Sequence, residues 1–330
     1  MPNSEKVVII GSGAAAYTAA IYAARADLRP LLFGGVAMGG QLMITSDVEN
    51  FPGFPEAILG PELMERMRKQ CERLGVRIVQ ELVSRVDFSK RPFQLESTEG
   101  TKASAESVIV ATGANAKLLG LPAEKRLMGH GVSACATCDG FFFKNQHIAV
   151  VGGGDSAMEE ATFLTRFAES VTIVHRREDF RASPIMLERA QNDPKIRWAT
   201  NAAITGVEGE NKVEALQLTD TVTGEQRTMP ATGLFLAIGH DPRSDLFRNA
   251  VTVDDEGYVL VGSKLPGSEA TVAGTATSIE GVFACGDLVD HTYRQAITAA
   301  GTGCQSALDA ERYLAALADR PEPASAGAGH

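Results

Sequence analysis

Short runs of β-branched and aliphatic residues, each ending at a glycine, recur along the chain. The first covers residues 6–10 and ends at Gly11-Ser12-Gly13; an alanine-rich stretch to about Ala26 and a second apolar run at 30–33 follow. Continuous apolar runs of this length are typical of strands buried on both faces, and the alanine-rich stretch is typical of a helix. The pattern predicts strand, glycine turn, helix and strand: the βαβ unit of a nucleotide-binding fold.

The residues of this first turn suit a bound pyrophosphate. Gly11 would permit the tight bend, Gly13 would let a phosphate approach the backbone, and small Ala16 would allow the helix to pack closely on the strand. The unpaired N–H groups at the helix N-terminus would face the phosphates. The acidic residue that usually binds a ribose is missing, because Phe33-Gly34-Gly35 ends the second strand. A plain tight turn therefore remains an alternative.

The same pattern returns in the middle of the chain. Residues 147–151 form another buried run, which ends at Gly152-Gly153-Gly154 and precedes a helical stretch over 156–167 and an apolar run at 171–174. Two fingerprints in one chain are far more specific than one. The second unit ends in His175-Arg176-Arg177, whose positive charge favours the 2′-phosphate of NADP over the free ribose of NAD. A solvated basic turn is the alternative.

The segments around these units complete an α/β pattern. Residues 39–53 are rich in Gly, Pro and polar residues and predict loops, whereas residues 61–74 predict a helix. Short alternating runs over 76–97 predict a small antiparallel insertion. Buried strands ending at glycine are expected again at 107–113, 233–239 and 282–286. A long helix is expected over 293–318, where Gly301 and Gly303 would permit close approach of a ligand or another backbone.

Composition and charge limit the classes of function. Of 330 residues, 44% are apolar and 22% charged, as in globular proteins, and the length allows two domains. The net charge of −10 disfavours a nucleic-acid surface, which needs clustered Lys and Arg. The longest apolar runs, such as 234–238, are too short to cross a bilayer, and residues 1–6 lack a signal pattern. We therefore expect a cytoplasmic protein.

Cys135 and Cys138 are separated by two residues and followed directly by Asp139. Two thiols at this spacing can close as a small, reducible disulfide, and Asp139 could carry protons as the disulfide opens and closes. Half of a zinc site and a pair of inert buried thiols are the alternatives. A structural zinc needs four ligands, and the other cysteines are isolated in the sequence. These are Cys71, Cys285 and Cys304.

Taken in order, five motifs carry a resemblance over about residues 6–315. They are Gly-Ser-Gly at 11–13, Cys-Ala-Thr-Cys-Asp-Gly at 135–140, Gly-Gly-Gly-Asp-Ser-Ala-Met-Glu-Glu-Ala at 152–161, His-Arg-Arg at 175–177, and Gly-Asp with Arg-Gln-Ala at 286–296. This series resembles the low-molecular-weight, bacterial-type thioredoxin reductases. They are FAD- and NADPH-dependent, class II members of the pyridine nucleotide-disulfide oxidoreductase family.

The resemblance implies two Rossmann-like domains, each three-layered with a parallel central sheet. A split FAD domain, 1–116 and 245–330, would enclose an NADPH domain, 117–244, that carries the dithiol. NADPH would reduce FAD, FAD would reduce the Cys135–Cys138 disulfide, and the dithiol would reduce thioredoxin. Members are homodimers, and their NADPH domain rotates about connectors that match 113–116 and 239–244.

The resemblance also implies which residues form the sites. Cys138 would face the flavin, Cys135 would attack the substrate disulfide, and Asp139 would exchange protons. The expected FAD contacts are Gly11, Ser12, Gly13, Ala15, Gln41, Asn50, Val83, Gly113, Gly286, Asp287, Arg294, Gln295 and Ala296. The expected NADPH contacts are Gly152, Gly154, Ser156, His175, Arg176, Arg177 and Arg181. No metal is implied.

The chain departs from the family pattern at several positions. Ala14 and Ala16 stand where Pro and Gly are commoner, and both are small enough to be tolerated. Cys285 stands where Ala is usual, beside the predicted flavin contacts, and we expect a small buried thiol there. Residues 262–275 exceed the usual length and predict a surface loop insertion.

Other functions remain open from the sequence. A flavin reductase of this fold that feeds a peroxidase usually carries an extra N-terminal thiol domain, for which there is no room before Val7. The second fingerprint and its basic end argue against a ferredoxin-linked relative that uses no pyridine nucleotide. A non-catalytic redox sensor or binding protein would keep the nucleotide sites, and steady NADPH consumption with a disulfide acceptor would separate it from an enzyme.

Overall fold

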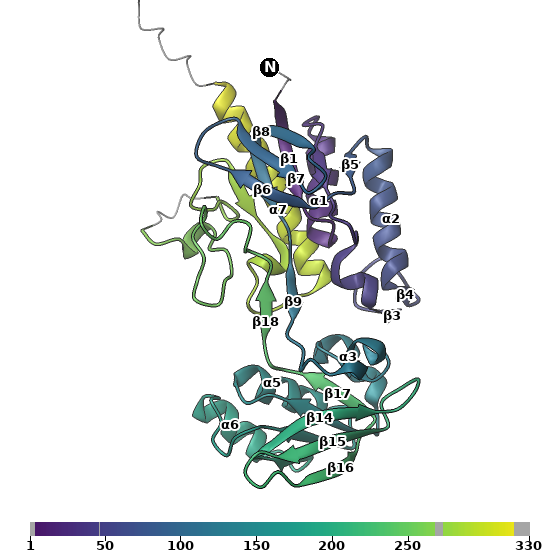
Figure 1. The fold of residues 1–330 in the computed structure, drawn as a ribbon. Helices are drawn as coiled ribbons and strands as arrows, with labels where there is room; N and C mark the ends of the chain where they lie inside the picture. The colour runs from purple at the N-terminus through teal and green to yellow at the C-terminus, as the bar shows by residue number, and fades with distance from the viewer. Residues whose placement is uncertain (1–3, 46, 268–272, 320–330) are drawn as a thin grey trace, which may run out of the picture. The chain divides into compact units, whose positions relative to one another are not determined.

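The computed structural model describes residues 4–45, 47–267 and 273–319. The chain forms two compact units (Figure 1). Unit 1 comprises Met1–Met43, Phe51–Ala114 and Pro242–His330, and unit 2 comprises Ile44–Asn50 and Asn115–Asp241. Both units combine helices with parallel strands, which confirms the predicted α/β class. Within the described ranges, no helix is both long and apolar enough to cross a membrane.

Unit 1 is built on a sheet that has seven strands among the described residues, in the order β5-β2-β1-β8-β7-β6, with β19 also on β8. The strands are β1 (Glu5–Ile10), β2 (Leu31–Phe33), β5 (Arg77–Val79), β6 (Val83–Asp87), β7 (Phe93–Ser97), β8 (Lys102–Val110) and β19 (Val282–Ala284). β2, β1, β8 and β19 pair in parallel, whereas β6, β7 and β8 pair antiparallel.

The assignment of β5 to the antiparallel insertion is wrong. β5 pairs in parallel with β2, with Leu31 opposite Arg77. It follows the helix α2 (Gly60–Arg73), and a strand that returns to a sheet after a crossover helix runs parallel. The alternation of apolar residues gives no direction, so only β6 and β7 form the expected insertion.

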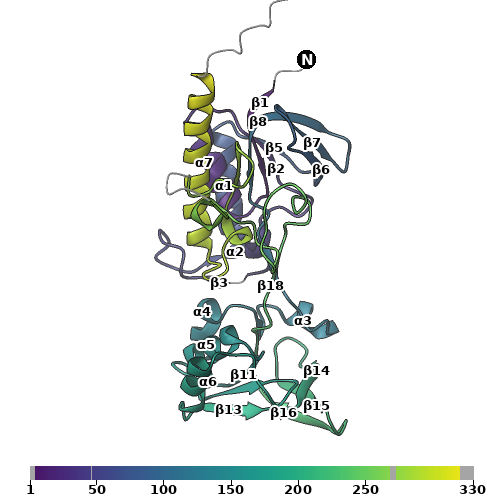
Figure 2. The same cartoon turned by 90° about the vertical axis from the view of Figure 1, so that its left-hand side faces the viewer.

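Three helices cover one face of this sheet (Figure 2): α1 (Ala14–Arg25), α2 and α7 (Ala296–Ala318). A Cβ at Gly303 would lie 2.2 Å from the carbonyl oxygen of Ala15, so glycine lets α7 approach α1, as predicted. Gly301 faces open space and plays no such part. α7 begins three residues later than expected, because Arg294 has φ 47°, which no α-helical residue adopts.

Shorter elements complete unit 1 and the segment next to it. These are β3 (Asp47–Val48), β4 (Ile58–Leu59) and the 3₁₀ turns η1 (Gly40–Ile44), η3 (Gly262–Lys264) and η4 (Gly286–Leu288). η1 lies where the sequence predicted only a loop. The expected insertion at 262–275 is described in part, since residues 268–272 lie outside the described residues. So does the tail from Pro321.

Unit 2 has a parallel sheet of five strands among its described residues, in the order β10-β17-β11-β12-β13. The strands are β10 (Val132–Ser133), β17 (Gly233–Leu236), β11 (His147–Val151), β12 (Ser170–Val174) and β13 (Ile196–Ala199). The helical elements are α3 (Pro122–Leu127), α4 (Ala136–Asp139), η2 (Gly140–Phe143), α5 (Asp155–Leu164) and α6 (Pro184–Gln191).

Two apolar cores hold the layers of unit 2 together. On one face of the sheet, Met158 and Leu164 of α5 pack against Ile148 and Phe235. On the other face lies an antiparallel sheet of β14 (Ala202–Glu208), β15 (Ala215–Asp220) and β16 (Gln226–Pro230), whose residues Leu216 and Leu218 share a core with Leu234. This helix, sheet and sheet layering places the carboxyl ends of β11 and β12 beside the start of α5.

The two connectors run as short strands, β9 (Ala114–Ala116) and β18 (His240–Pro242), which pair with each other. The Lys117 N–H donates to the Gly239 carbonyl at 3.0 Å, and the Arg243 N–H donates to the Gly113 carbonyl at 2.9 Å. The chain therefore leaves and re-enters unit 1 along adjacent paths.

Candidate active site

Cys135 and Cys138 form a disulfide with a Cα–Cα distance of 5.3 Å. Cys135 lies immediately before α4, and its carbonyl accepts hydrogen bonds from the N–H groups of Cys138, at 3.2 Å, and Asp139, at 3.1 Å. One helical turn between the two cysteines brings their side chains together. Both cysteines are half-buried, so the disulfide is accessible from the surface of unit 2.

Asp139 sits in a protected environment beside the disulfide. Burial raises the pKa of its carboxyl above the ordinary value, and a hydrogen bond from Ser133 opposes this rise. The Ser133 hydroxyl also accepts the N–H of Cys135 at 3.0 Å. Ser133 thus links the predicted proton carrier to the backbone of the redox cysteine. This role could not be predicted, because a serine two residues before a cysteine belongs to no motif.

Two of the three remaining cysteines are not placed for redox chemistry. Cys71 and Cys285 are fully buried, and burial raises the pKa of each thiol to about 12. The Ser306 hydroxyl donates to the Cys285 sulfur at 3.4 Å. Cys285 is therefore the small buried residue that the sequence predicted, with almost no thiolate at neutral pH. Cys304 is half-buried.

The predicted FAD fingerprint lies at one edge of the sheet of unit 1. Gly11, Gly113 and Gly286 follow β1, β8 and β19, which are neighbours in the parallel sheet. Gly11 has φ 130°, and a Cβ there would lie 2.2 Å from the carbonyl oxygen of Ala111. Gly13 faces open space, which leaves room for a ligand beside the N-terminus of α1. A crevice at the carboxyl ends of parallel strands is where nucleotides bind in such folds.

Further predicted FAD residues surround this turn. The Ser12 hydroxyl donates to the Gly34 carbonyl at 2.6 Å and accepts the Gly39 N–H at 3.1 Å, so it ties two glycine loops together. Other members lie in nearby elements: Ala15 in α1, Gln41 in η1, Val83 at the start of β6, and Arg294, Gln295 and Ala296 at the start of α7. Asn50 groups with unit 2, so its flavin contact stays a prediction.

Asp287 gives the clearest indication that unit 1 binds a ligand. One carboxylate oxygen of Asp287 is buried and has no hydrogen-bond partner. Burial raises the pKa of this carboxyl from its ordinary value of 3.8 to about 6. Buried polar atoms in proteins are almost always paired. A hydroxyl of a bound flavin nucleotide would satisfy this oxygen, so the residues present fit FAD.

The second fingerprint forms a cradle at the end of β11. A Cβ at Gly152 would lie 2.4 Å from the Ala237 carbonyl oxygen, and a Cβ at Gly153 would lie 2.2 Å from the His175 ring. Gly154 faces open space as the residue before α5, and Ser156 lies in the first turn of that helix. These glycines leave backbone N–H groups accessible to a phosphate, so this turn fits a dinucleotide. Gly153, which the sequence did not single out, is as constrained as Gly152.

Basic residues gather at the end of β12, next to this cradle. His175 is buried and stacks on Phe180 with ring centroids 4.9 Å apart, and burial lowers the pKa of its imidazole. Arg176, Arg177 and Arg181 are exposed and lie near enough to lower that pKa further. The Arg181 N–H donates to the Gly153 carbonyl at 2.7 Å, which brings its segment to the glycine turn. The predicted NADPH residues are thus together.

Two exposed aromatic residues close to the disulfide were not predicted from the sequence. Phe141 and Phe142 lie in η2, three and four residues after Cys138, and are 59% and 43% exposed. Phe141 packs edge-on against Phe167, with centroids 6.1 Å apart. Two large apolar side chains in water beside a redox centre suggest a contact with a protein partner. The three consecutive phenylalanines at 141–143 were the available signal in the sequence.

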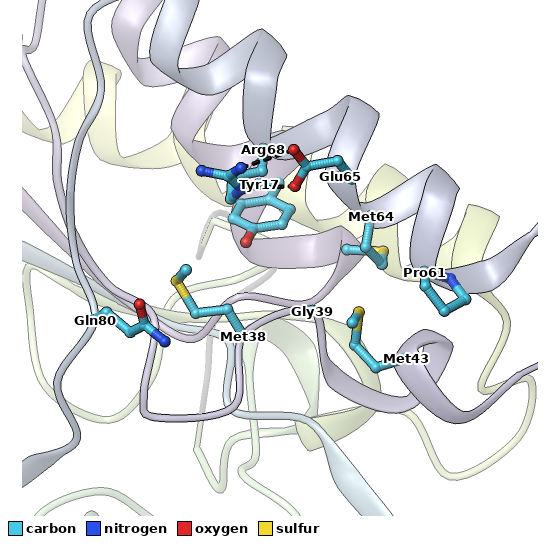
Figure 3. A pocket seen from close by; sticks show the side chains of 9 residues that line it. All are labelled: Tyr17, Met38, Gly39, Met43, Pro61, Met64, Glu65, Arg68 and Gln80. Carbon is cyan, nitrogen blue, oxygen red and sulfur yellow. Dashed lines mark hydrogen bonds and ion pairs between the residues drawn. The ribbon is translucent and has the colours of Figure 1, made fainter.

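A cavity of about 200 Å³ lies in unit 1 between α1, α2 and the loop before η1 (Figure 3). Tyr17 and the side chains of Met38, Met43 and Met64 line it, and the ion pair of Arg68 with Glu65 lies beside it. Burial raises the pKa of Tyr17 to about 12. The cavity shares α1 with the predicted FAD contact Ala15 and η1 with Gln41, and it shares no element with Cys135, Cys138 or Asp139.

Comparison with known proteins agrees with the geometry. The model of the pyridine nucleotide-disulphide oxidoreductase family matches residues 5–303. A thioredoxin reductase from Streptomyces clavuligerus is 57% identical over 99% of this chain and 100% of its own length. One from Mycolicibacterium smegmatis is 58% identical over 94% of this chain and 96% of its own.

A solved structure extends the likeness to the fold. The thioredoxin reductase from Giardia duodenalis is 41% identical and superposes with a TM-score of 0.87, covering 94% of this chain and 98% of that chain. The resemblance noted from the motifs is therefore confirmed. The chain belongs to the pyridine nucleotide-disulphide oxidoreductase family, among its thioredoxin reductases.

Proposed function

We propose that this protein is an NADPH-dependent thioredoxin reductase that uses Cys135 and Cys138 as its dithiol. The observation that carries the proposal is an accessible disulfide next to a buried carboxyl, in a chain with two nucleotide cradles. Purified protein loaded with FAD should oxidise NADPH steadily when oxidised thioredoxin is added. Absence of a response to thioredoxin, or equal use of NADH, would contradict the proposal.

The cofactors would supply the electrons, and the protein would supply the sulfur chemistry. When bound at the turns after β1 and β11, FAD and NADPH would together supply the two electrons that reduce the disulfide. The Cys135 thiolate would attack the thioredoxin disulfide, forming a mixed disulfide and releasing one thioredoxin thiolate. The Cys138 thiolate would then attack the Cys135 sulfur, which releases the second thiolate and restores the Cys135–Cys138 bond.

Asp139 would manage the protons of this exchange. A leaving thiolate must be protonated, and a carboxyl whose pKa is raised by burial holds a proton closer to neutral pH than an ordinary aspartate does. Asp139 directly follows Cys138 and would therefore be the proton donor and acceptor at this sulfur.

The domain assignment stays as the sequence predicted it. Residues 1–116 and 245–330 would bind FAD through the fingerprint at Gly11, and residues 117–244 would bind NADPH through the turn at Gly152. The unpaired Asp287 oxygen supports the first assignment, and the arginines after β12 support the second.

Arg176 and Arg177 should select NADPH over NADH. Both guanidinium groups are exposed at the end of β12, where they can pair with a 2′-phosphate. We expect the double substitution Arg176→Ala and Arg177→Ala to raise the KM for NADPH by ~30-fold while kcat changes little, because the lost contacts are made equally in the ground and transition states. Steady-state kinetics with both nucleotides would measure this.

Rates with NADH serve as the internal control for the arginine variant. NADH lacks the 2′-phosphate, so its kinetic constants should stay within about twofold of wild type. If the variant lost activity with NADPH and with NADH in parallel, the arginines would support the fold and would not recognise the 2′-phosphate of NADPH.

Asp287→Asn should separate stability from cofactor binding. The pKa of Asp287 is raised to about 6 in the folded protein. Ionisation of this buried carboxyl therefore destabilises the fold as pH rises from about 4 to 6, and the destabilisation is complete at pH 7. We expect the FAD-free variant to be more stable at pH 7 by ~2 kcal/mol, because two pKa units correspond to nearly 3 kcal/mol. FAD binding should weaken, because a carboxylate acceptor is lost.

Urea denaturation of the FAD-free proteins at pH 4 and pH 7 would measure this effect. Asp245→Asn, at an exposed aspartate of the same unit, is the matched control. A variant that is less stable than wild type at pH 7 would show that the Asp287 carboxylate is satisfied within the protein.

Partner and assembly complete the proposal. Phe141 and Phe142 would contact thioredoxin, since they are exposed beside the disulfide that must meet it. A homodimer is proposed through unit 1, where α1 and α7 expose Tyr22, Ile297 and Leu308. The cytoplasm is the proposed location, because a reducing compartment suits a protein whose redox disulfide must be opened at each cycle.

A further inference from the structure

The segment from Gly286 to Gln295, here called the flavin-side segment, links β19 to α7. It contains the unpaired carboxylate of Asp287 and ends in Arg294 and Gln295, which are predicted FAD contacts. The inference below concerns how this segment is held, and it rests on the proposed function.

The backbone of the flavin-side segment adopts an uncommon conformation. Arg294 has φ 47°, in the left-handed region that a long side chain rarely occupies. The Asp290 carboxylate accepts hydrogen bonds from the N–H groups of Thr292, Tyr293 and Arg294, at 2.8 to 2.9 Å. Such conformations persist only where the surroundings enforce them, and they are concentrated at ligand sites.

His291 joins this turn to a distant part of unit 1. Its Nε2 lies 2.6 Å from the Asp254 Oδ2, and its ring lies against Tyr258 with centroids 3.8 Å apart. The carbonyl of His291 accepts a hydrogen bond from the Arg294 guanidinium, which also interacts with the Tyr258 hydroxyl. The imidazole, the phenol and the guanidinium therefore form one connected cluster beneath the strained residue.

Asp254 is itself fixed by its own turn. Its Oδ1 accepts the N–H groups of Glu256, at 2.9 Å, and Tyr258, at 3.0 Å, which leaves Oδ2 directed at the imidazole. Glu256 adds a second carboxylate 3.7 Å from the Nδ1 of His291. The acceptor for His291 is thus preorganised, and the side chains of His291 and Asp254 are only 37% and 24% exposed.

We propose that His291 is a positioning residue for flavin binding. Its contacts with Asp254 and Tyr258 hold the turn at 290–294 in the conformation that presents Arg294 and Gln295 to FAD. A polar contact this exposed contributes little to stability by itself. The backbone at 290–294 has no intrinsic preference for its observed conformation. Loss of the contact between His291 and Asp254 should therefore lower the fraction of molecules that are ready to bind FAD.

Two substitutions separate positioning from packing. His291→Phe keeps a ring against Tyr258 but removes the contact with Asp254. Asp254→Asn keeps the Oδ1 acceptor for the 254–258 turn but removes the charge that faces His291. His130→Phe, at an exposed histidine of unit 2, is the matched control. Each FAD-free protein would be titrated with FAD and followed by flavin fluorescence, by the visible flavin spectrum and by its own Tm.

We expect FAD dissociation constants about tenfold higher for His291→Phe and Asp254→Asn, with an altered flavin spectrum, while the Tm of the FAD-free protein stays within about 2 °C of wild type. His130→Phe should match wild type in all three measurements. Unchanged FAD affinity and spectrum in His291→Phe would overturn the inference, and so would a fall in Tm that accounts for the lost affinity. Failure of the wild-type protein to bind FAD would instead refute the proposed function.

Discussion

Cys138→Ser is expected to lower NADPH-dependent thioredoxin reduction by at least ~10³-fold, because the thiol that accepts electrons and later resolves the mixed disulfide is lost. NADPH should still bleach the flavin, since that step involves neither cysteine. The variant should also trap thioredoxin: the remaining Cys135 attacks the substrate disulfide, and nothing releases the adduct. Non-reducing electrophoresis would show a covalent complex with Cys138→Ser and none with Cys135→Ser.

Cys304→Ser is the control for this experiment, because it removes a half-buried thiol outside the redox centre. Its turnover should equal that of wild type. If Cys135→Ser trapped thioredoxin and Cys138→Ser did not, the two sulfurs would have exchanged roles. If both single variants kept turning over thioredoxin, the disulfide would not be the route for electrons.

Asp139→Asn should give the second largest loss, about 10²-fold in kcat with thioredoxin, which is typical when a general acid is removed. Burial raises the pKa of Asp139, so wild-type activity that needs the protonated carboxyl should fall as pH rises through that value. The amide cannot titrate, so the variant should lack this limb of the pH profile. Turnover measured between pH 5 and 9 would show the difference.

Glu169→Gln, an exposed carboxylate elsewhere in unit 2, provides the matched control and should leave the pH profile unchanged. Reduction of the flavin by NADPH in a stopped-flow measurement should be the same in Asp139→Asn and wild type. A variant that kept the alkaline limb of the pH profile would assign that proton to another group, and Asp139 would then be structural.

The sequence predicts the parts of the fold that depend on local pattern. Buried runs ending at Gly11, Gly152 and Gly286 identify strands and turns, because glycine fits where a Cβ would strike a neighbour. That neighbour is a carbonyl oxygen at Gly11 and Gly152, and the Cβ of Ala15 at Gly286. The direction of β5 follows from its pairing with β2, which is distant in the sequence. The first residue of α7 follows from a side-chain contact in the turn before it, where the Asp290 carboxylate accepts the Arg294 N–H. Alternation and helix propensity carry no information on either.

The same division applies to the candidate site. Cys135, Cys138 and the arginines after β12 could be found by motif, because their chemistry requires those residue types at that spacing. Ser133 and His291 could not, since their roles arise from contacts: one with the backbone of Cys135, the other with Asp254, 37 residues away in the sequence. The contact of Ser133 is local, but a serine at that position carries no motif, and the contact of His291 becomes visible only when the folded chain brings its two segments together.

The place of β8 in the sheet has a consequence for synthesis of the chain on the ribosome. β8 pairs in parallel with both β1 and β19, and Val108 lies opposite Val282. Until β19 and α7 have been made, residues 108–110 of β8 lack their partner strand and the face of α1 that packs on α7 is uncovered. Residues 115–241, in contrast, are contiguous and can fold as soon as they emerge. Unit 2 should therefore fold first, and the sheet of unit 1 should be completed only after β19 has been synthesised.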